Sequence, residues 1–545
     1  MSDISKMMSG SPVLLGNNTI PGVRVPKEVA DQIPTIFKAC RDFGLDFYPT
    51  IVEFLTYDEI SEIAAYGGFP VRYPHWSFGM EYEELSKGFE HGMHRIYEMV
   101  VNTNPCYLYC LDSNTLVDHI TVIAHALGHN DFFKNNVYFS ATDTNMLNKM
   151  ANHGTRIRNY IARWGKDRVI EFIDHCRRLD TLINPYDAWN KKEYNPPKIR
   201  DERNYRFPKR TEISSDRNYM DPWINTKDRM DREKLRVEEA DAAEEIGAFG
   251  KPEKNIFGWL RKNAPLKEWQ KDVMSMLYDE SMYFAPQRMT KMLNEGWASF
   301  VDYKLMAGKG YASLGQESDD MGIIEYAAHK MGVLGGKYSM NPYNLGFKLF
   351  LDIEDRWNKG QFGPEWDDCT NQKDRENWDK NLGLGLQKCF EVRKCYNDVM
   401  ALHEFFTQEF CDKNEFFDWK LYPNGEYRIE SRDVNVIRRK LIQKYSNGHL
   451  PDVRLTDSNH LGRGWFLIEH QWDGRMLFDS YVRHTLVSLY TIWQNVIILA
   501  SRTDDGQEFV YFCESTNHKD VVTLTREEYE KRVVERIDKM PISKK

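Results

Sequence analysis

The sequence predicts a mainly α-helical fold, with a large helical domain followed by a smaller C-terminal α+β domain. Two patterns lead to this prediction. Apolar residues recur at three- and four-residue spacing through most of the first 415 residues, as on the buried face of a helix. After about Phe416 the spacing becomes typical of strands, in segments such as GWFLIEHQWDG and EFVYFCE. The 545-residue chain is long enough to bury a large core.

Four parts are expected along the chain. Residues 1–186 form an N-terminal helical part, in which VADQIPTIFKACRDFGL and KGFEHGMHRIYEMVVN have the helical spacing. Residues 187–255 are rich first in proline and then in charge, which predicts a surface excursion or linker. Residues 256–415 return to the helical spacing, and residues 416–545 combine strand-like segments with one or two helices.

Composition and charge argue against several classes of protein. A net charge of −9 argues against a protein that binds nucleic acids or anionic membranes through a basic surface. No apolar run reaches the length of a membrane span, and the first residues lack the pattern of a secretory signal. The nine cysteines include no CxxC pair, as expected where thiols stay reduced. We therefore expect a cytoplasmic protein that does not bind nucleic acid.

The segment HALGHNDFFKNN, residues 125–136, carries the first candidate site. On a helix, His125 and His129 lie one turn apart on the same face, and the apolar residues around them indicate that this helix is buried. Buried imidazoles need partners, and a metal ion would satisfy both. The alternative is a pair of core histidines that bond to the backbone or to neighbouring polar side chains. The glutamate that follows the first histidine in many zinc hydrolases is replaced here by Ala126.

The segment NEGWASFVDY supplies a third candidate ligand. Glu295 lies on a predicted helix beside Leu293 and Phe300, and a buried glutamate needs either an ion pair or a metal. Two histidines and a glutamate, with one position left to water, form the ligand set of catalytic zinc sites. We therefore predict a zinc ion, or another divalent metal, at His125, His129 and Glu295. A structural salt bridge is the alternative for Glu295.

Because Ala126 cannot accept a proton, the general base of such a site must come from elsewhere. Glu325 and His329 in EYAAHKMG lie four residues apart on a predicted helix and are the first candidates for catalytic residues, followed by Glu404. An exposed helix pair is the alternative for Glu325 and His329. Without a replacement base, the site would be a poor hydrolase.

Three further segments combine aromatic and polar side chains, as expected of a mainly apolar cleft with a few polar anchors. They predict substrate-binding residues, with helix capping and loop bonding as the alternative for each. The candidates are His75 and Trp76 in PHWSFG, Lys134, Asn135 and Asn136 in FFKNN, and Asn341 and Tyr343 in NPYNLG.

Two resemblances to known families rest on these motifs. NEGWASF is similar to the NEGFA-type segment that supplies the glutamate ligand in zincin aminopeptidases, so the large helical domain is expected to be zincin-like. A more extensive resemblance is to the SpoVR family, the stage V sporulation protein R group. It rests on six segments in the same order, YPHWSFG (73–79), NTNPC (102–106), GHNDFFKNN (128–136), KNAPLKEWQKD (262–272), NEGWASF (294–300) and NPYNLG (341–346).

The SpoVR resemblance implies a link to spore cortex formation in spore formers, or to stress response in other bacteria. It also implies association with an AAA+ serine protein kinase and a von Willebrand A-type protein. Because no settled chemistry comes with the family, two hypotheses stay open. The first is a zinc-dependent hydrolase or acyl-transfer enzyme that acts on amide or peptide bonds. The second is a non-catalytic regulatory or scaffold partner of those two proteins.

Overall fold

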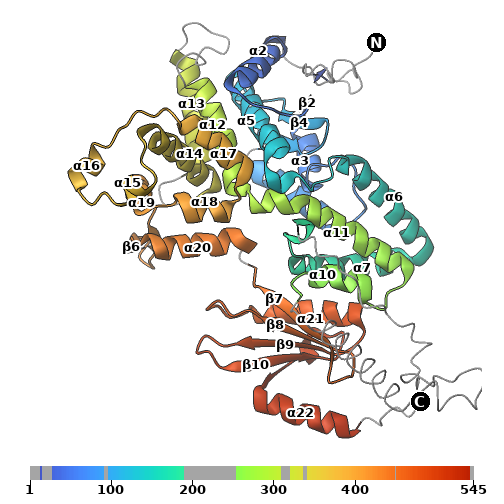
Figure 1. Ribbon diagram of the computed structural model, residues 1–545. Helices are drawn as coiled ribbons and strands as arrows, with labels where there is room; N and C mark the ends of the chain where they lie inside the picture. The colour runs from blue at the N-terminus through green and yellow to red at the C-terminus, as the bar shows by residue number, and fades with distance from the viewer. Residues whose placement is uncertain are drawn as a thin grey trace, which may run out of the picture. The chain divides into compact units, whose positions relative to one another are not determined.

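The chain forms two compact units in the computed structural model (Figure 1). The first comprises Met1–Ile173 and Asp272–Leu450, and the second comprises Asp174–Lys271 and Pro451–Lys545. The domain boundaries set from the sequence remain predictions, and most of the predicted linker, 187–255, lies outside the described residues. The structure describes residues 13–14, 27–90, 96–189, 253–307, 320–335, 340–447 and 450–539.

A four-stranded sheet lies in the first unit, with the strand order β1-β2-β4-β3. Strands β1 (Val13–Leu14), β2 (Thr50–Leu55) and β4 (Cys106–Leu111) are parallel to one another, whereas β3 (Glu98–Val101) is antiparallel and lies at the edge. The helical prediction for KGFEHGMHRIYEMVVN is wrong over β3. Near its end this segment has two valines that pair with β4, and a strand of four residues is too short to show a period of its own.

Three helices lie at the centre of the first unit, the first packed on the sheet, the second on the first, and the third on the second. They are α5 (Leu116–Asn135), α12 (Lys291–Met306) and α14 (Pro342–Lys359), and their apolar side chains belong to one core cluster with those of β2 and β4. The segment predicted to be a buried helix around the two histidines is α5, whose residues from Asp118 to Phe133 are all buried. Thr115 caps this helix in a capping box with Asp118.

Close contacts at glycines hold these three helices together. A β-carbon at Gly128 of α5 would lie 2.9 Å from the Cα of Ala298 in α12, and one at Gly296 of α12 would lie 2.4 Å from the carbonyl carbon of Gly346 in α14. Only glycine permits such an approach between backbones. Because Gly128 and Gly296 are chain neighbours of His129 and Glu295, these contacts also set how close those two side chains come.

Further helices surround this centre. They are α2 (Lys27–Phe43), α3 (Tyr57–Ala65), α4 (Trp76–Glu90), α6 (Met146–Trp164), α13 (Asp320–Leu334), α15 (Pro364–Asp367), α16 (Gln372–Glu376), α17 (Gly385–Cys395), α18 (Asp398–Phe405), α19 (Gln408–Asn414) and α20 (Val434–Asn447). Strands β5 (Asp418–Leu421) and β6 (Tyr427–Ser431) form a hairpin in the same unit. The chain passes from the first unit to the second within α7 (Lys166–Arg178), after Ile173. It returns to the first unit within α11 (Glu268–Met289), after Lys271.

The second unit is built on a five-stranded sheet with the order β11-β10-β9-β8-β7. All neighbouring strands are antiparallel except β8 and β9, which are parallel and joined through α21. The elements of this unit are α10 (Ile256–Asn263), β7 (Val453–His460), β8 (Trp465–His470), α21 (Asp479–Trp493), β9 (Ile497–Arg502), β10 (Glu508–Cys513), β11 (Val522–Thr525) and α22 (Arg526–Lys539).

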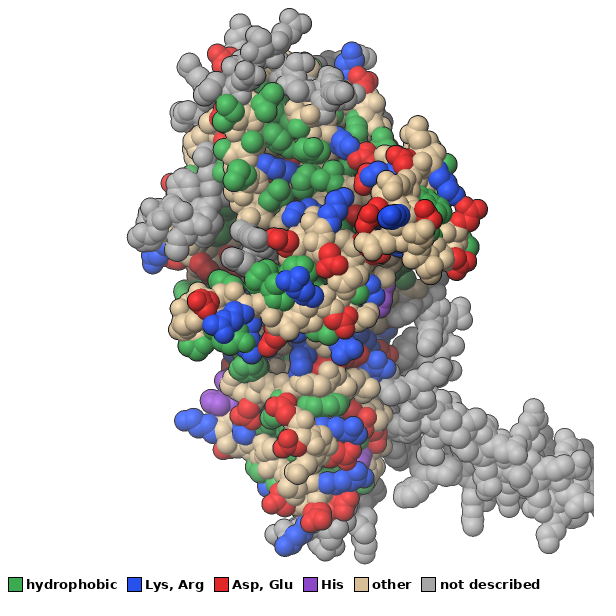
Figure 2. All heavy atoms as spheres, turned by 90° about the vertical axis from the view of Figure 1, so that its left-hand side faces the viewer, with side chains coloured by type: hydrophobic (Ala, Val, Ile, Leu, Met, Phe, Trp, Pro, Cys, Tyr) green, Lys and Arg blue, Asp and Glu red, His purple; other side chains and the backbone are tan. Residues whose placement is uncertain are grey.

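The predicted fold class is confirmed: the chain is mainly helical, with a smaller sheet-containing region toward its C-terminus. The segments GWFLIEHQWDG, NVIILAS and EFVYFCE form β8, β9 and β10, as their strand-like pattern indicates. Within the part of the chain that the structure describes, no helix is both long and apolar enough to cross a membrane. On the face shown in Figure 2, acidic and basic side chains are interspersed rather than gathered by sign. The zincin-like description of the helical part stays a prediction.

Candidate metal centre

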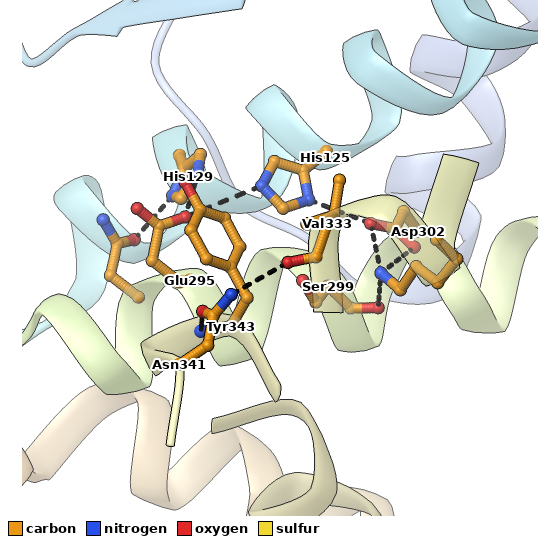
Figure 3. A network of polar contacts seen from close by, with 10 residues as sticks. His125, His129, Glu295, Ser299, Asp302, Val333, Asn341 and Tyr343 are labelled. Atoms are coloured by element: carbon orange, nitrogen blue, oxygen red, sulfur yellow. Dashed lines mark hydrogen bonds and ion pairs between the residues drawn. The ribbon is translucent and has the colours of Figure 1, made fainter. Parts of the chain in front are cut away.

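The structure brings the three predicted ligands together between α5 and α12 (Figure 3). Oε2 of Glu295 lies 3.3 Å from Nε2 of His129 and 3.8 Å from Nε2 of His125. The ring centroids of the two histidines are 4.7 Å apart, and the potential ligand atoms of the triad all lie within 4.8 Å of one another. Histidines one helical turn apart and a glutamate from a facing helix can therefore reach a single ion.

The carboxylate of Glu295 has an unsatisfied oxygen. Its Oε2 is buried and makes no hydrogen bond of normal geometry, although both histidines face it. A buried polar atom without a hydrogen bond is costly and calls for an explanation such as an ion. The arrangement thus fits a divalent cation bound by two imidazole nitrogens and one carboxylate oxygen.

Each histidine is held in a fixed orientation through its other ring nitrogen. Nδ1 of His125 lies 2.9 Å from Oδ2 of Asp302, and Nδ1 of His129 lies 3.0 Å from Oδ1 of Asn294. With an acceptor at each Nδ1, a neutral imidazole carries its proton there, which leaves the lone pair of Nε2 available to a metal. Metal-binding histidines are usually fixed by a second hydrogen bond of this kind.

Asp302 is itself held by a buried cation. Nζ of Lys330 lies 2.7 and 2.9 Å from the two oxygens of Asp302 and donates a further hydrogen bond to the carbonyl of Ser299. The hydroxyl of Tyr326 donates to Asp302 at 2.8 Å. Burial would raise the pKa of Asp302, but Lys330 and His125 lower it overall, so that it stays a carboxylate. Since Lys330 compensates the negative charge of Asp302, the negative charge of Glu295 is the one available to a bound cation.

The pKa shifts of His125 and Glu295 show how their charges compensate each other without a metal. Burial alone would lower the pKa of His125, but the hydrogen bond with Asp302 and the nearby carboxylate of Glu295 raise it to about 9. Burial would raise the pKa of Glu295, but the charges of His129 and His125 beside it hold that pKa far below its usual value. A protonated His125 therefore compensates the Glu295 carboxylate, and a bound cation would replace that proton.

Tyr343 is the predicted substrate-binding residue that reaches the triad. Its ring stacks on that of His125 with the centroids 6.4 Å apart, and Figure 3 shows it beside Glu295. Burial, followed by the negative charge of Glu295, raises the pKa of Tyr343, so its hydroxyl stays protonated and able to donate. Asn341 supports it by capping α14 at the N–H of Tyr343, 2.8 Å away, and by donating to the carbonyl of Val333.

The other predicted substrate-binding residues have partners outside the triad. These partners are those expected of capping, loop bonding and surface ion pairs. His75 bonds to Ser77, Trp76 is 60% exposed, Lys134 pairs with Asp46, Asn135 donates to the carbonyls of Asp46 and Asp131, and Asn136 donates to those of Arg393 and Tyr396.

The predicted base candidates differ in their surroundings. Nδ1 of His329 lies 3.0 Å from Asp118, whereas Glu325 lies one turn earlier on α13 and is half-buried. Glu404 accepts a hydrogen bond from the hydroxyl of Tyr396 at 2.7 Å. Of these three candidates, His329 has an electrostatic link to the triad through a fourth residue. The charge of His329 acts on the carboxyl group of Glu98, and the charges of the triad act on the same group.

Glu98 is a charged residue near the triad that the sequence analysis missed. It lies on β3, and its pKa is raised by burial and modulated by His125, His129 and Glu295. The one local signal is an acidic residue within the apolar segment IYEMVV. The sequence alone does not show that this strand packs against α5, so the acidic residue could not be linked to the two histidines.

Comparison with known proteins supports one family. The family model described as SpoVR like protein matches residues 25–450, which is more than half of the chain. The chain belongs to the SpoVR family. It is similar to the uncharacterized protein YcgB of Escherichia coli strain K12, with 27% identity over 497 residues, which cover 86% of this chain and 91% of that protein. No solved structure matches the chain.

Several of the SpoVR motifs lie on the helices that surround the triad. GHNDFFKNN lies on α5, NEGWASF on α12 and NPYNLG at the start of α14, so three of the six segments meet at the triad. NTNPC joins β3 to β4. The SpoVR match ends at residue 450, where the last segment of the first unit also ends.

Proposed function

We propose that this SpoVR-family protein is a metal-dependent hydrolase of amide or peptide bonds, with zinc or another divalent metal held by His125, His129 and Glu295. The observation that carries the proposal is the convergence of two Nε2 atoms on the unsatisfied Oε2 of Glu295, with each Nδ1 fixed by a buried acceptor. A structural salt bridge alone would leave that oxygen without a hydrogen bond. When bound, the metal supplies a Lewis acid for the amide carbonyl and lowers the pKa of a water molecule.

The remaining residues of the site bind and orient the substrate. Tyr343 presents a protonated hydroxyl beside the triad, as a donor for the carbonyl oxygen on which charge develops. Asp302 and Asn294 hold the two imidazoles so that Nε2 points inward. The burial of α5 keeps bulk water from the rear of the site, so charges there interact strongly.

A substrate class follows from the chemistry and from the family. We propose peptides as substrates, including those of the cell wall, because the SpoVR family is named after a sporulation protein. Acyl transfer belongs to the same proposal, since it differs from hydrolysis only in that another nucleophile attacks the carbonyl carbon in place of water. The kinase and von Willebrand A-type partners and the cytoplasmic location stay predictions.

The test is peptide hydrolysis by the full-length protein. We would incubate the protein, with and without added zinc, with a mixed peptide library and identify newly formed termini by mass spectrometry. We expect new termini with the zinc-loaded wild type and none with a His129→Ala, Glu295→Ala variant. If the zinc-loaded wild type releases no new termini from protein-derived or cell-wall peptides, the hydrolase proposal is contradicted.

A further inference from the structure

The direction of the Glu98 side chain follows from the strand register. Glu98 is paired across the sheet with Cys110, so the two side chains lie on the same face. Cys110 belongs to the core cluster that contains the apolar residues of α5, such as Ile123 and Leu127. The Glu98 side chain therefore points to the face of the sheet that α5 covers, toward the helix that carries both histidines.

Electrostatics agree with this direction. The charges of His125, His129, Glu295 and His329 all act on the carboxyl group of Glu98. Burial is the main influence on this carboxyl group and raises its pKa above the usual value for a glutamate, as is common for carboxylates at catalytic sites.

Partners among the described residues do not explain the burial of the Glu98 carboxylate. None of the described residues makes a hydrogen bond or an ion pair with it, in contrast to Glu295 and Asp302. A half-buried glutamate without a partner is uncommon, because burying a charge without compensation is costly. The strand register and these electrostatic interactions thus place a carboxylate on the face of the sheet that α5 covers, while position 126 of that helix is an alanine rather than an acid.

We propose that Glu98 is the general base of this site, in place of the glutamate that is absent at position 126. The proposal rests on the proposed function, since it concerns the hydrolysis of an amide at the same triad. Glu98 accepts a proton from water as the water oxygen bonds to the amide carbon. It then returns that proton to the nitrogen as the C–N bond breaks, so that amide and water give a carboxylic acid and an amine.

The earlier candidates fit this role less well. His329 is tied through Nδ1 to Asp118 and its ring packs on Tyr97 at 4.8 Å, so it is a positioning residue that acts through its charge on Glu98. Among the described residues, Glu325 makes no hydrogen bond or ion pair with the triad, and Glu404 bonds to Tyr396. Both histidines act electrostatically on Glu98, as they do on the ligand Glu295.

The test uses Co²⁺ as the probe, because its visible absorption reports on the groups around it. Full-length wild type, Glu98→Gln and Glu53→Gln are each loaded with Co²⁺, and the spectrum is followed as the pH is raised. Glu53 is the matched control, because it lies on β2 and pairs with Tyr109, so its carboxyl, whose pKa burial also raises, is on the opposite face of the same sheet.

We expect all three proteins to bind the same amount of Co²⁺. In Glu98→Gln the midpoint of the spectral titration shifts to lower pH by about one unit or more, because a nearby negative charge that disfavours loss of a proton from bound water is gone. Glu53→Gln titrates like the wild type. In the peptide assay, hydrolysis by Glu98→Gln falls by about 10²–10⁴-fold while its metal content is unchanged.

Two outcomes would overturn the role of Glu98 and leave the hydrolase proposal standing. Loss of Co²⁺ from a folded Glu98→Gln protein would make Glu98 a metal ligand, and a titration identical to that of the wild type would place it too far from the bound water. Failure of the wild type to bind Co²⁺ would instead contradict the proposed function, and the role of Glu98 with it.

Discussion

His125 couples metal binding to pH at the scale of a single residue. Its pKa of about 9 means that the metal-free protein holds a proton there at neutral pH, and a metal must displace it. Below about pH 9, we expect the apparent zinc affinity to fall by about tenfold for each unit of pH. Competition with a chelator at several pH values measures this slope. An affinity that does not change between neutral pH and pH 9 would contradict the assignment of His125 as a ligand.

The same shift predicts how the stability of the metal-free protein depends on pH. Because the pKa of His125 is raised on folding, its contribution is fully present below its unfolded value of about 6.5. That contribution is lost as the pH rises through the folded value of about 9. We expect the melting temperature of the metal-free protein to decrease over this range, and His125→Ala to remove that part of the decrease.

Asn294 allows a test of the residues that hold the candidate ligands in place by hydrogen bonds. Its Oδ1 fixes Nδ1 of His129, and removal of such a partner typically weakens metal binding by about 10–100-fold. We expect a loss of this size for Asn294→Ala in a zinc competition assay. Asn294→Asp keeps an acceptor oxygen and is expected to retain binding. Equal loss in both variants would show that the acceptor at this position is not what matters.

At this scale the sequence predicts the ligands but not their supports. His125 and His129 lie one helical turn apart, and Glu295 lies in a motif that resembles a ligand segment, so local patterns suffice for the triad. Asp302 and Glu98 reach it only through the packing of α12 and the register of β3. Such contacts between elements leave no trace in residue spacing, which is why the sequence predicts a base on a helix instead.

At the scale of elements, the glycine contacts between α12 and α14 set the position of Glu295. A methyl group at position 296 would overlap the backbone of Gly346, and overpacking of this kind typically costs about 1–3 kcal/mol. We expect Gly296→Ala to lower the melting temperature and to weaken metal binding. Gly332→Ala in α13 is the matched control, since its β-carbon meets nothing within 4 Å and helical alanine is favoured over glycine.

Results for the two glycine variants can contradict this account directly. If Gly296→Ala were as stable as Gly332→Ala, the approach of α12 to α14 would be looser than the structure shows. If Gly296→Ala were destabilised but bound zinc normally, that approach would not set the position of Glu295.

Elements were predictable where one segment shows its own period. The buried helix α5 and the strands β8, β9 and β10 follow the patterns read from their sequences. The edge strand β3 did not, because four residues that follow a helical run are too few to show a period. Its identity depends on β4, which lies after the NTNPC turn.

At the scale of the whole molecule, the candidate ligands all lie in the first unit. A ligand that binds only the folded form stabilises it by about 2.7 kcal/mol at a hundredfold excess over its Kd. We therefore expect zinc to slow hydrogen exchange in peptides from α5 and α12 and to leave those from β8 to β10 unchanged. Equal protection of both regions would contradict a site confined to the first unit.

The measurement that tests the central claim most directly is the metal content of the full-length protein. The protein is purified without a metal-affinity tag, and its metals are quantified by mass spectrometry beside the His129→Ala, Glu295→Ala variant. The account predicts close to one equivalent of a divalent metal in the wild type and its loss in the folded variant. Absence of bound metal from both folded proteins, even after incubation with zinc, would contradict it and leave His125 and His129 as core residues.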